Sequence, residues 1–167
     1  MGNKAIEKEL LPKSQGLKKE VIGALALGGA LILGYFVLIA AISITEETTH
    51  FFGENEVVIN DLEKVSEIIM RELTSNPENF LLVLVIVLFI EEFFFRAFLT
   101  TKIGIIPSTI LFTIAHFGYG SIAEIIGAFF LGLILAYWFK RNNSIIQNYF
   151  GHLIYDIFAI MLYFIFA

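Results

Sequence analysis

The chain has 167 residues, a net charge of −5 and no cysteine; 57% of its residues are hydrophobic and only 16% are charged. Soluble domains contain about 45–50% apolar and about 25% charged residues, so the composition excludes an ordinary soluble domain and predicts an integral membrane protein in contact with lipid. The lack of cysteine excludes disulfides, thiolate metal ligands and a cysteine nucleophile, and no basic cluster with interleaved aromatic residues indicates a nucleic-acid partner.

The N-terminal part of the chain predicts a short cytoplasmic segment followed by a first membrane helix. Residues 1–20 carry five lysines, and residues 21–44 are uncharged throughout. An apolar helix of about 20 residues spans the hydrocarbon core of a bilayer. Gly23, Gly28 and Gly34 in this stretch suit close packing against other helices.

Residues 45–79 form an acidic segment that is expected to lie outside the cytoplasm. The run Asn60–Glu63 resembles a capping box, in which the side chain of the first residue binds the start of its own helix. The apolar residues that follow recur at helical spacing and predict an amphipathic helix on the membrane surface. They are Leu62, Val65, Ile69 and Leu73.

The next helix is predicted to start at Asn76, the cap, with Pro77 at the first helical position, and to run through Leu99. The apolar stretch from Pro107 to Phe117 is too short to span a bilayer alone, so we expect a short buried helix that its neighbours shield. The two remaining spans are expected at residues 122–139 and 144–166.

Lysine and arginine in short loops stay on the cytoplasmic side of a membrane. Lys102, Lys140 and Arg141 fall on the same side as the N-terminal lysines if the chain has about five membrane segments. The sequence therefore predicts an all-α, polytopic helix bundle of about five segments, one of them short and buried. It is expected to be a multi-pass protein of the cell membrane with a cytoplasmic N-terminus, and residues 80–167 form its catalytic core.

Six ionisable side chains interrupt the apolar runs of this core. They are Glu91, Glu92, Arg96, His116, His152 and Asp156. Each costs about 2.5–3.5 kcal/mol at the centre of a bilayer, so they are expected to meet one another in the fold. A helical rise of about 1.5 Å per residue places four of them in one band of depth near the membrane centre. These four are Glu91, His116, His152 and Asp156.

The spacing within each helix suggests roles for these groups. Glu92 and Arg96 are four residues apart with the acid first, which favours a structural ion pair. Glu91 has no basic residue one turn away, so it is the candidate general base, with His116 beside it to activate a water. His152, with Asp156 one turn behind it, is the candidate group that stabilises an oxyanion. This chemistry is amide hydrolysis inside a membrane.

The three motifs resemble the signatures of the CAAX protease and bacteriocin-processing family, also called the Abi family. They are Glu91-Glu92-x-x-x-Arg96, Phe112-x-x-x-His116 and His152-x-x-x-Asp156, in the order of that family and within residues 80–160. The resemblance implies a glutamate-dependent intramembrane endopeptidase without a cofactor. Its substrate would be a membrane-associated peptide or lipidated protein, such as a prenylated CAAX peptide or a leader peptide.

This chain departs from the family in two respects. The CAAX-processing members typically have asparagine where this chain has Asp156. An ionised carboxylate would repel an oxyanion, so Asp156 is expected either to be protonated or to act by orienting His152. The chain is also shorter than most members of the family, which leaves less room for a prenylated peptide.

Other interpretations of the same residues remain open. Two histidines and a glutamate could hold zinc, and Ser121 with His152 would make a serine dyad. A non-enzymatic membrane protein of the same fold, such as an immunity or partner-binding factor, is the alternative from a different class. Glu124 lies at a predicted helix start, where negative charge is favourable, and is given no functional role. The sequence does not choose an oligomeric state.

Overall fold

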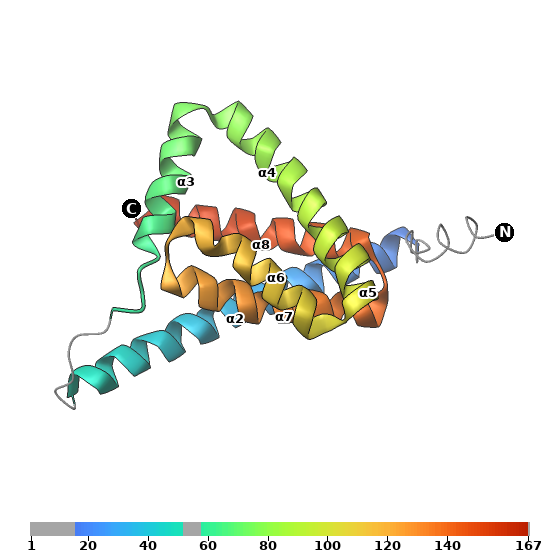
Figure 1. Ribbon diagram of the computed structural model, residues 1–167. Coiled ribbons are helices and arrows are strands. Elements are labelled where there is room, and N and C mark those ends of the chain that lie inside the picture. Colours follow the sequence, from blue (N-terminus) through green and yellow to red (C-terminus); the bar gives the residue numbers. More distant parts are fainter. Residues whose placement is uncertain (1–15, 52–57, 167) are drawn as a thin grey trace.

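The computed structural model describes residues 16–51 and 58–166, and every regular element in these two ranges is a helix (Figure 1). The prediction of an all-α membrane bundle is confirmed. Most of the cytoplasmic segment predicted at residues 1–20 lies outside the described residues. Among the described residues, three helices are long and apolar enough to cross a membrane, namely α2 (Leu17–Phe51), α7 (Ile122–Asn142) and α8 (Ile145–Phe166).

Helix α2 extends beyond the predicted span of residues 21–44 at both ends. At its C-terminal end the hydroxyls of Thr45 and Thr48 donate to the carbonyl oxygens of Ala41 and Ile44, at 2.8 and 2.6 Å. Because these hydroxyls bond to carbonyl oxygens of the same helix, the polar residues are accommodated in it and α2 extends into the acidic segment. The predicted boundary at residue 44 marks the end of the apolar stretch and not the end of the helix.

Close packing of α2 on α8 depends on glycine in both helices. A Cβ atom at Gly28 would lie 2.9 Å from Cγ2 of Ile154, and one at Gly151 would lie 2.8 Å from Cγ of Leu27. Small residues at such positions let two helix backbones approach closely, as predicted for the first span. Leu27 joins a buried cluster that extends onto α7, with Leu31, Leu131 and Leu135.

Helices α3 (Glu63–Ser75) and α4 (Pro77–Glu91) meet at a sharp corner and form an arch beside α8 (Figure 1). The corner confirms the predicted helix start, because the side chain of Asn76 accepts from the backbone N–H of Asn79 at 3.3 Å and Pro77 opens the helix. α4 continues directly into a π-helix, η1 (Glu92–Thr100), and then a short turn, α5 (Thr101–Ile103).

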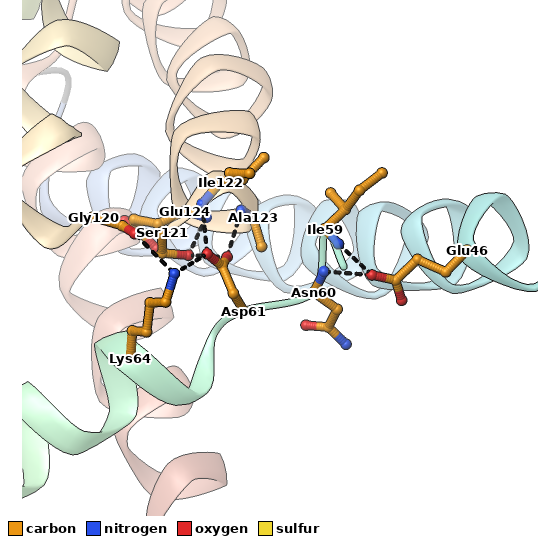
Figure 2. Close-up of polar contacts among 10 residues, drawn as sticks. All are labelled: Glu46, Ile59, Asn60, Asp61, Lys64, Gly120, Ser121, Ile122, Ala123 and Glu124. Carbon is orange, nitrogen blue, oxygen red and sulfur yellow. Dashed lines mark hydrogen bonds and ion pairs between the residues drawn. The ribbon is translucent and has the colours of Figure 1, made fainter. Parts of the chain in front are cut away.

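The capping box predicted at Asn60–Glu63 is wrong. The residue that caps α3 is Leu62, which offers no side-chain acceptor, and the carboxylate of Asp61 instead caps a helix distant in sequence. Figure 2 shows Asp61 accepting from the Ser121 hydroxyl at 2.7 Å and from the backbone N–H groups of Ile122 and Ala123 at 3.1 Å each. The start of α3 is thereby fastened to the start of α7.

Lys64 completes this junction. Its ammonium group donates to the Asp61 carboxylate at 2.9 Å and to the carbonyl oxygen of Gly120 at 3.3 Å (Figure 2). Burial by itself would raise the pKa of Asp61, but the hydrogen bonds from Ser121, Lys64 and the two backbone amides hold that pKa well below its ordinary value. The carboxylate is therefore ionised throughout the neutral range.

Replacing Asp61 with alanine is expected to lower the free energy of unfolding by about 1–2 kcal/mol, the usual effect of losing a helix cap. Because the folded pKa is lowered, the stabilisation is fully present above about pH 4, the unfolded value, and is lost as the pH falls below it. Thermal unfolding in detergent from pH 3 to pH 7 measures this. An Asp61→Asn variant, which keeps one acceptor oxygen, serves as the intermediate control; equal stability of all three proteins at pH 7 would contradict the capping role.

The short helix α6 (Ile105–Ala115) is followed by a 3₁₀ turn, η2 (His116–Tyr119). We predicted this piece as a buried, shielded helix, but the structure exposes one of its faces, which carries Ile106, Ile110 and Ile114. The opposite, buried face carries hydroxyls, and Ser108 is within hydrogen-bond distance of Thr100 at 2.8 Å. Apolar groups outside and polar groups inside are consistent with lipid as the surrounding solvent.

Candidate active site

A cavity of about 290 Å³ lies between the arch of α3 and α4 and the helices α7 and α8. All four residues predicted to be catalytic line it: Glu91, His116, His152 and Asp156. They come from three separate segments, at the end of α4, the start of η2 and the middle of α8. The structure thus brings together side chains that are up to 65 positions apart in the sequence.

The remainder of the cavity wall is mostly apolar. α3 contributes Val65 and Ile69, and α4 contributes one face of its length. The α4 residues that line the cavity before Glu91 are Phe80, Val83, Leu84, Val87 and Leu88. The cavity therefore has a polar end at the catalytic candidates and an apolar wall along the arch.

Glu91 stands at the junction of two helix types. It is the last residue of α4, and the π-helix begins at Glu92. A π-helix has more residues per turn than an α-helix, and such segments occur frequently at functional sites. At this junction Glu91 lines the cavity while Glu92 is completely buried. Glu91 is also within electrostatic range of His152.

His116 is held in one orientation by its own segment. Its Nδ1 lies 2.8 Å from the carbonyl oxygen of Phe112, and the two rings pack with centroids 4.4 Å apart. A carbonyl oxygen only accepts, so Nδ1 carries the proton. In the neutral ring, Nε2 is then a hydrogen-bond acceptor.

His152 lies between two carboxylates. Its Nδ1 is 2.9 Å from Oε1 of Glu92, and its Nε2 is 3.7 Å from Oδ1 of Asp156, one turn further along α8. The first distance is a hydrogen bond, whereas the second is too long for one. The ring is consequently fixed through Nδ1, and Nε2 remains available to a third group.

The predicted ion pair of Glu92 and Arg96 is present, with Nε and Oε2 3.6 Å apart and both side chains fully buried. Sequence reasoning missed the other partners of Glu92. Its carboxylate also accepts a hydrogen bond from the Asn148 amide at 3.1 Å and one from Nδ1 of His152 at 2.9 Å. Asn148 lies four residues before His152 on α8, so the two side chains share one face of the helix. This spacing was the signal in the sequence from which Asn148 could have been assigned to the site.

The Arg96 guanidinium sits over the ring of Phe112, 4.2 Å from the centroid. The same ring packs against His116. Arg96 and Phe112 thus connect the buried Glu92 carboxylate to His116 through a series of direct contacts. A cation over an aromatic face is worth about 2 kcal/mol when both groups are desolvated.

The structure gives Ser121 a different role from the one considered for it in a dyad. Ser121 is fully buried; its hydroxyl donates to Asp61 and accepts from the backbone N–H of Glu124 at 3.1 Å, and it does not line the cavity. It therefore serves as a helix cap and not as the nucleophile of a dyad with His152. Within residues 16–51 and 58–166, no three histidine or acidic side chains are grouped as metal ligands.

Comparison with protein families matches residues 74–158, just over half of the chain, to the family described as type II CAAX prenyl endopeptidase Rce1-like. The matched region holds all six ionisable residues that interrupt the apolar runs of residues 80–167, and it runs from the end of α3 into α8. Searches of curated proteins and of solved structures gave no match. On this match, the chain belongs to the Rce1-like family of type II CAAX prenyl endopeptidases.

Proposed function

We propose that this protein is a glutamate-dependent intramembrane endopeptidase that hydrolyses a peptide bond of a membrane-associated peptide. The observation that carries the proposal is the gathering of Glu91, His116, His152 and Asp156 around one cavity. Family membership supports an endopeptidase of the CAAX type. The roles below follow from the contacts of each residue.

Glu91 and His116 would activate the attacking water. The water donates one hydrogen to the Glu91 carboxylate and one to Nε2 of His116, the acceptor nitrogen left by the bond from Nδ1 to Phe112. As the water oxygen bonds to the carbonyl carbon, Glu91 takes its proton. The same proton then passes to the leaving amine nitrogen as the C–N bond breaks, giving an amine and a carboxylic acid, which then releases its proton to solvent.

His152 would stabilise the oxyanion formed by that attack. Glu92 accepts from Nδ1, so an imidazolium at His152 has its second N–H, at Nε2, available to the substrate oxygen. Asp156, whose Oδ1 is 3.7 Å from Nε2, would act on this ring through its negative charge, which favours the imidazolium, and would not donate to the oxyanion itself. This assignment accommodates an acid where CAAX-processing relatives have asparagine.

The substrate we favour carries an apolar group next to the scissile bond. The wall formed by α3 and α4 is apolar along the length of the cavity, which suits a prenyl chain or the apolar residues of a leader peptide. The family description favours the prenylated CAAX peptide of these two.

The purified protein in detergent is expected to cleave a prenylated CAAX peptide, and mass spectrometry identifies the bond. In water enriched in ¹⁸O, the new carboxylate should carry one heavy oxygen because the water attacks directly. Excess chelator should leave the rate unchanged; a loss that zinc restores would contradict a mechanism carried by Glu91. Failure to cleave prenylated, unprenylated and leader peptides alike would favour the non-enzymatic, partner-binding alternative.

A further inference from the structure

A third acidic side chain lines the cavity and has no part in the proposed hydrolysis. Glu124, in the first turn of α7, faces the same space as Glu91 and Asp156 and is within electrostatic range of both. Of the described residues that line this cavity, three are acidic and none is lysine or arginine. At its polar end the acids therefore outnumber the one cation that the proposed mechanism requires, the imidazolium of His152.

The start of a helix does not account for Glu124. The first backbone N–H groups of α7 are already satisfied, because Asp61 accepts from Ile122 and Ala123 and Ser121 accepts from the N–H of Glu124 (Figure 2). Within the described residues, the Glu124 carboxylate itself makes no hydrogen bond or ion pair. A carboxylate that lines a cavity without a partner is poised to bind a donor from outside the chain.

The cavity that Glu124 lines also holds tyrosine side chains. Tyr119, Tyr155 and Tyr163 line the same cavity, and each is within electrostatic range of Glu124. The faces of aromatic rings attract cations, with an energy that rises when the pair is shielded from water. A cavity lined by a carboxylate and several tyrosines is suited to an ammonium or guanidinium group.

A second cavity, of about 630 Å³, lies on the other side of Tyr163, a residue that lines both spaces. It too is lined by acids, Glu63 and Glu67 of α3, and by no lysine or arginine. Two adjoining cavities with charges of one sign concentrate the field and draw in a cation. Acidic residues thus line both cavities, which meet at Tyr163.

From these contacts we propose that Glu124 is a specificity-determining residue that binds a cationic group of the substrate, a lysine or arginine side chain close to the scissile bond. The inference rests on the proposed peptidase function and adds to it the charge of the preferred substrate. A hydrogen bond to a charged group is worth about 1.5–3 kcal/mol, so a preference of about tenfold or more in kcat/KM is expected.

Matched peptide pairs test the inference. Each pair carries either lysine or its uncharged near-isostere norleucine at one position flanking the cleaved bond, and the ratio of the two kcat/KM values is measured. Wild type should favour lysine by about tenfold at one position or more, and Glu124→Gln should bring that ratio close to one. Glu78→Gln is the matched control, because this acid is exposed on α4 and lines neither cavity; it should keep the wild-type ratio.

The outcomes separate the two proposals. Cleavage of the norleucine peptides by wild type with no advantage for lysine at any position would overturn the role of Glu124 and leave the peptidase intact. If no peptide is cleaved, the role of Glu124 is tested by measuring how tightly wild type binds fluorescent versions of the same peptide pairs. Tighter binding of lysine that Glu124→Gln removes would support the cation site, and equal or absent binding would overturn it.

Discussion

Replacing Glu91 with glutamine is expected to lower kcat/KM for peptide cleavage by about 10³-fold or more. Glutamine has nearly the shape of glutamate but cannot take a proton from water, and a positioned general base contributes about 10²–10⁴ to a rate. Glu91 lines the cavity and is not part of the buried network that Glu92 makes, so its amide should be accommodated without repacking. The measurement is the initial rate of cleavage per mole of folded protein.

The matched control for this substitution is again Glu78→Gln, which removes the same charge from the exposed first turn of α4. It should cleave at the wild-type rate, and thermal unfolding in detergent should show both variants folded. A Glu91→Gln protein that is folded and retains more than about a tenth of the activity would remove Glu91 as the base. A different residue would then have to take the proton from the attacking water.

Replacing Arg96 with methionine is expected to give the largest loss of stability, about 3–5 kcal/mol. Both members of the Glu92–Arg96 pair are fully buried. Without the guanidinium, the Glu92 carboxylate keeps its hydrogen bonds from Asn148 and His152 but loses its permanent positive neighbour. Denaturant-induced unfolding in mixed micelles measures the change in free energy.

The double variant Glu92→Gln/Arg96→Met separates charge from packing. It removes both charges together, and a glutamine oxygen can still accept from Asn148 or His152. Replacing a whole buried pair is often nearly neutral, so the double variant should recover much of the stability that Arg96→Met loses. If the double variant recovers none of the stability that Arg96→Met loses, the contribution of Arg96 comes from its packing on Phe112 and not from its charge.

Much of the fold could be predicted because membrane helices are encoded locally. The apolar runs at residues 21–44, 122–139 and 144–166 each lie within or largely coincide with an observed helix, and the cap at Asn76 needs only its immediate neighbours. The capping role of Asp61 could not be predicted in the same way. Its partners Ser121, Ile122 and Ala123 are about sixty positions away, and the local pattern fits a cap of α3 equally well.

The candidate site could be predicted only in part. Helical spacing and depth pointed to Glu91, His116, His152 and Asp156, and these four do share a cavity, while their catalytic roles stay predictions. The bond between Glu92 and His152 was missed because the change from an α-helix to a π-helix after Glu91 has no sequence signature. Glu92 was therefore assigned only its neighbour in sequence, Arg96.

The junction at Asp61 limits how the cavity can widen. Lifting α3 away from α7 would break the bonds of Asp61 and Lys64 to the start of α7 all at once. Between the middle of α4 and α8, by contrast, the described residues make one side-chain hydrogen bond, an exposed one of 3.4 Å from the Tyr149 hydroxyl to the carbonyl oxygen of Val85. Separating α4 from α8 would therefore break fewer hydrogen bonds than separating α3 from α7, so the α4 side of the cavity is the side that can widen at the lower cost.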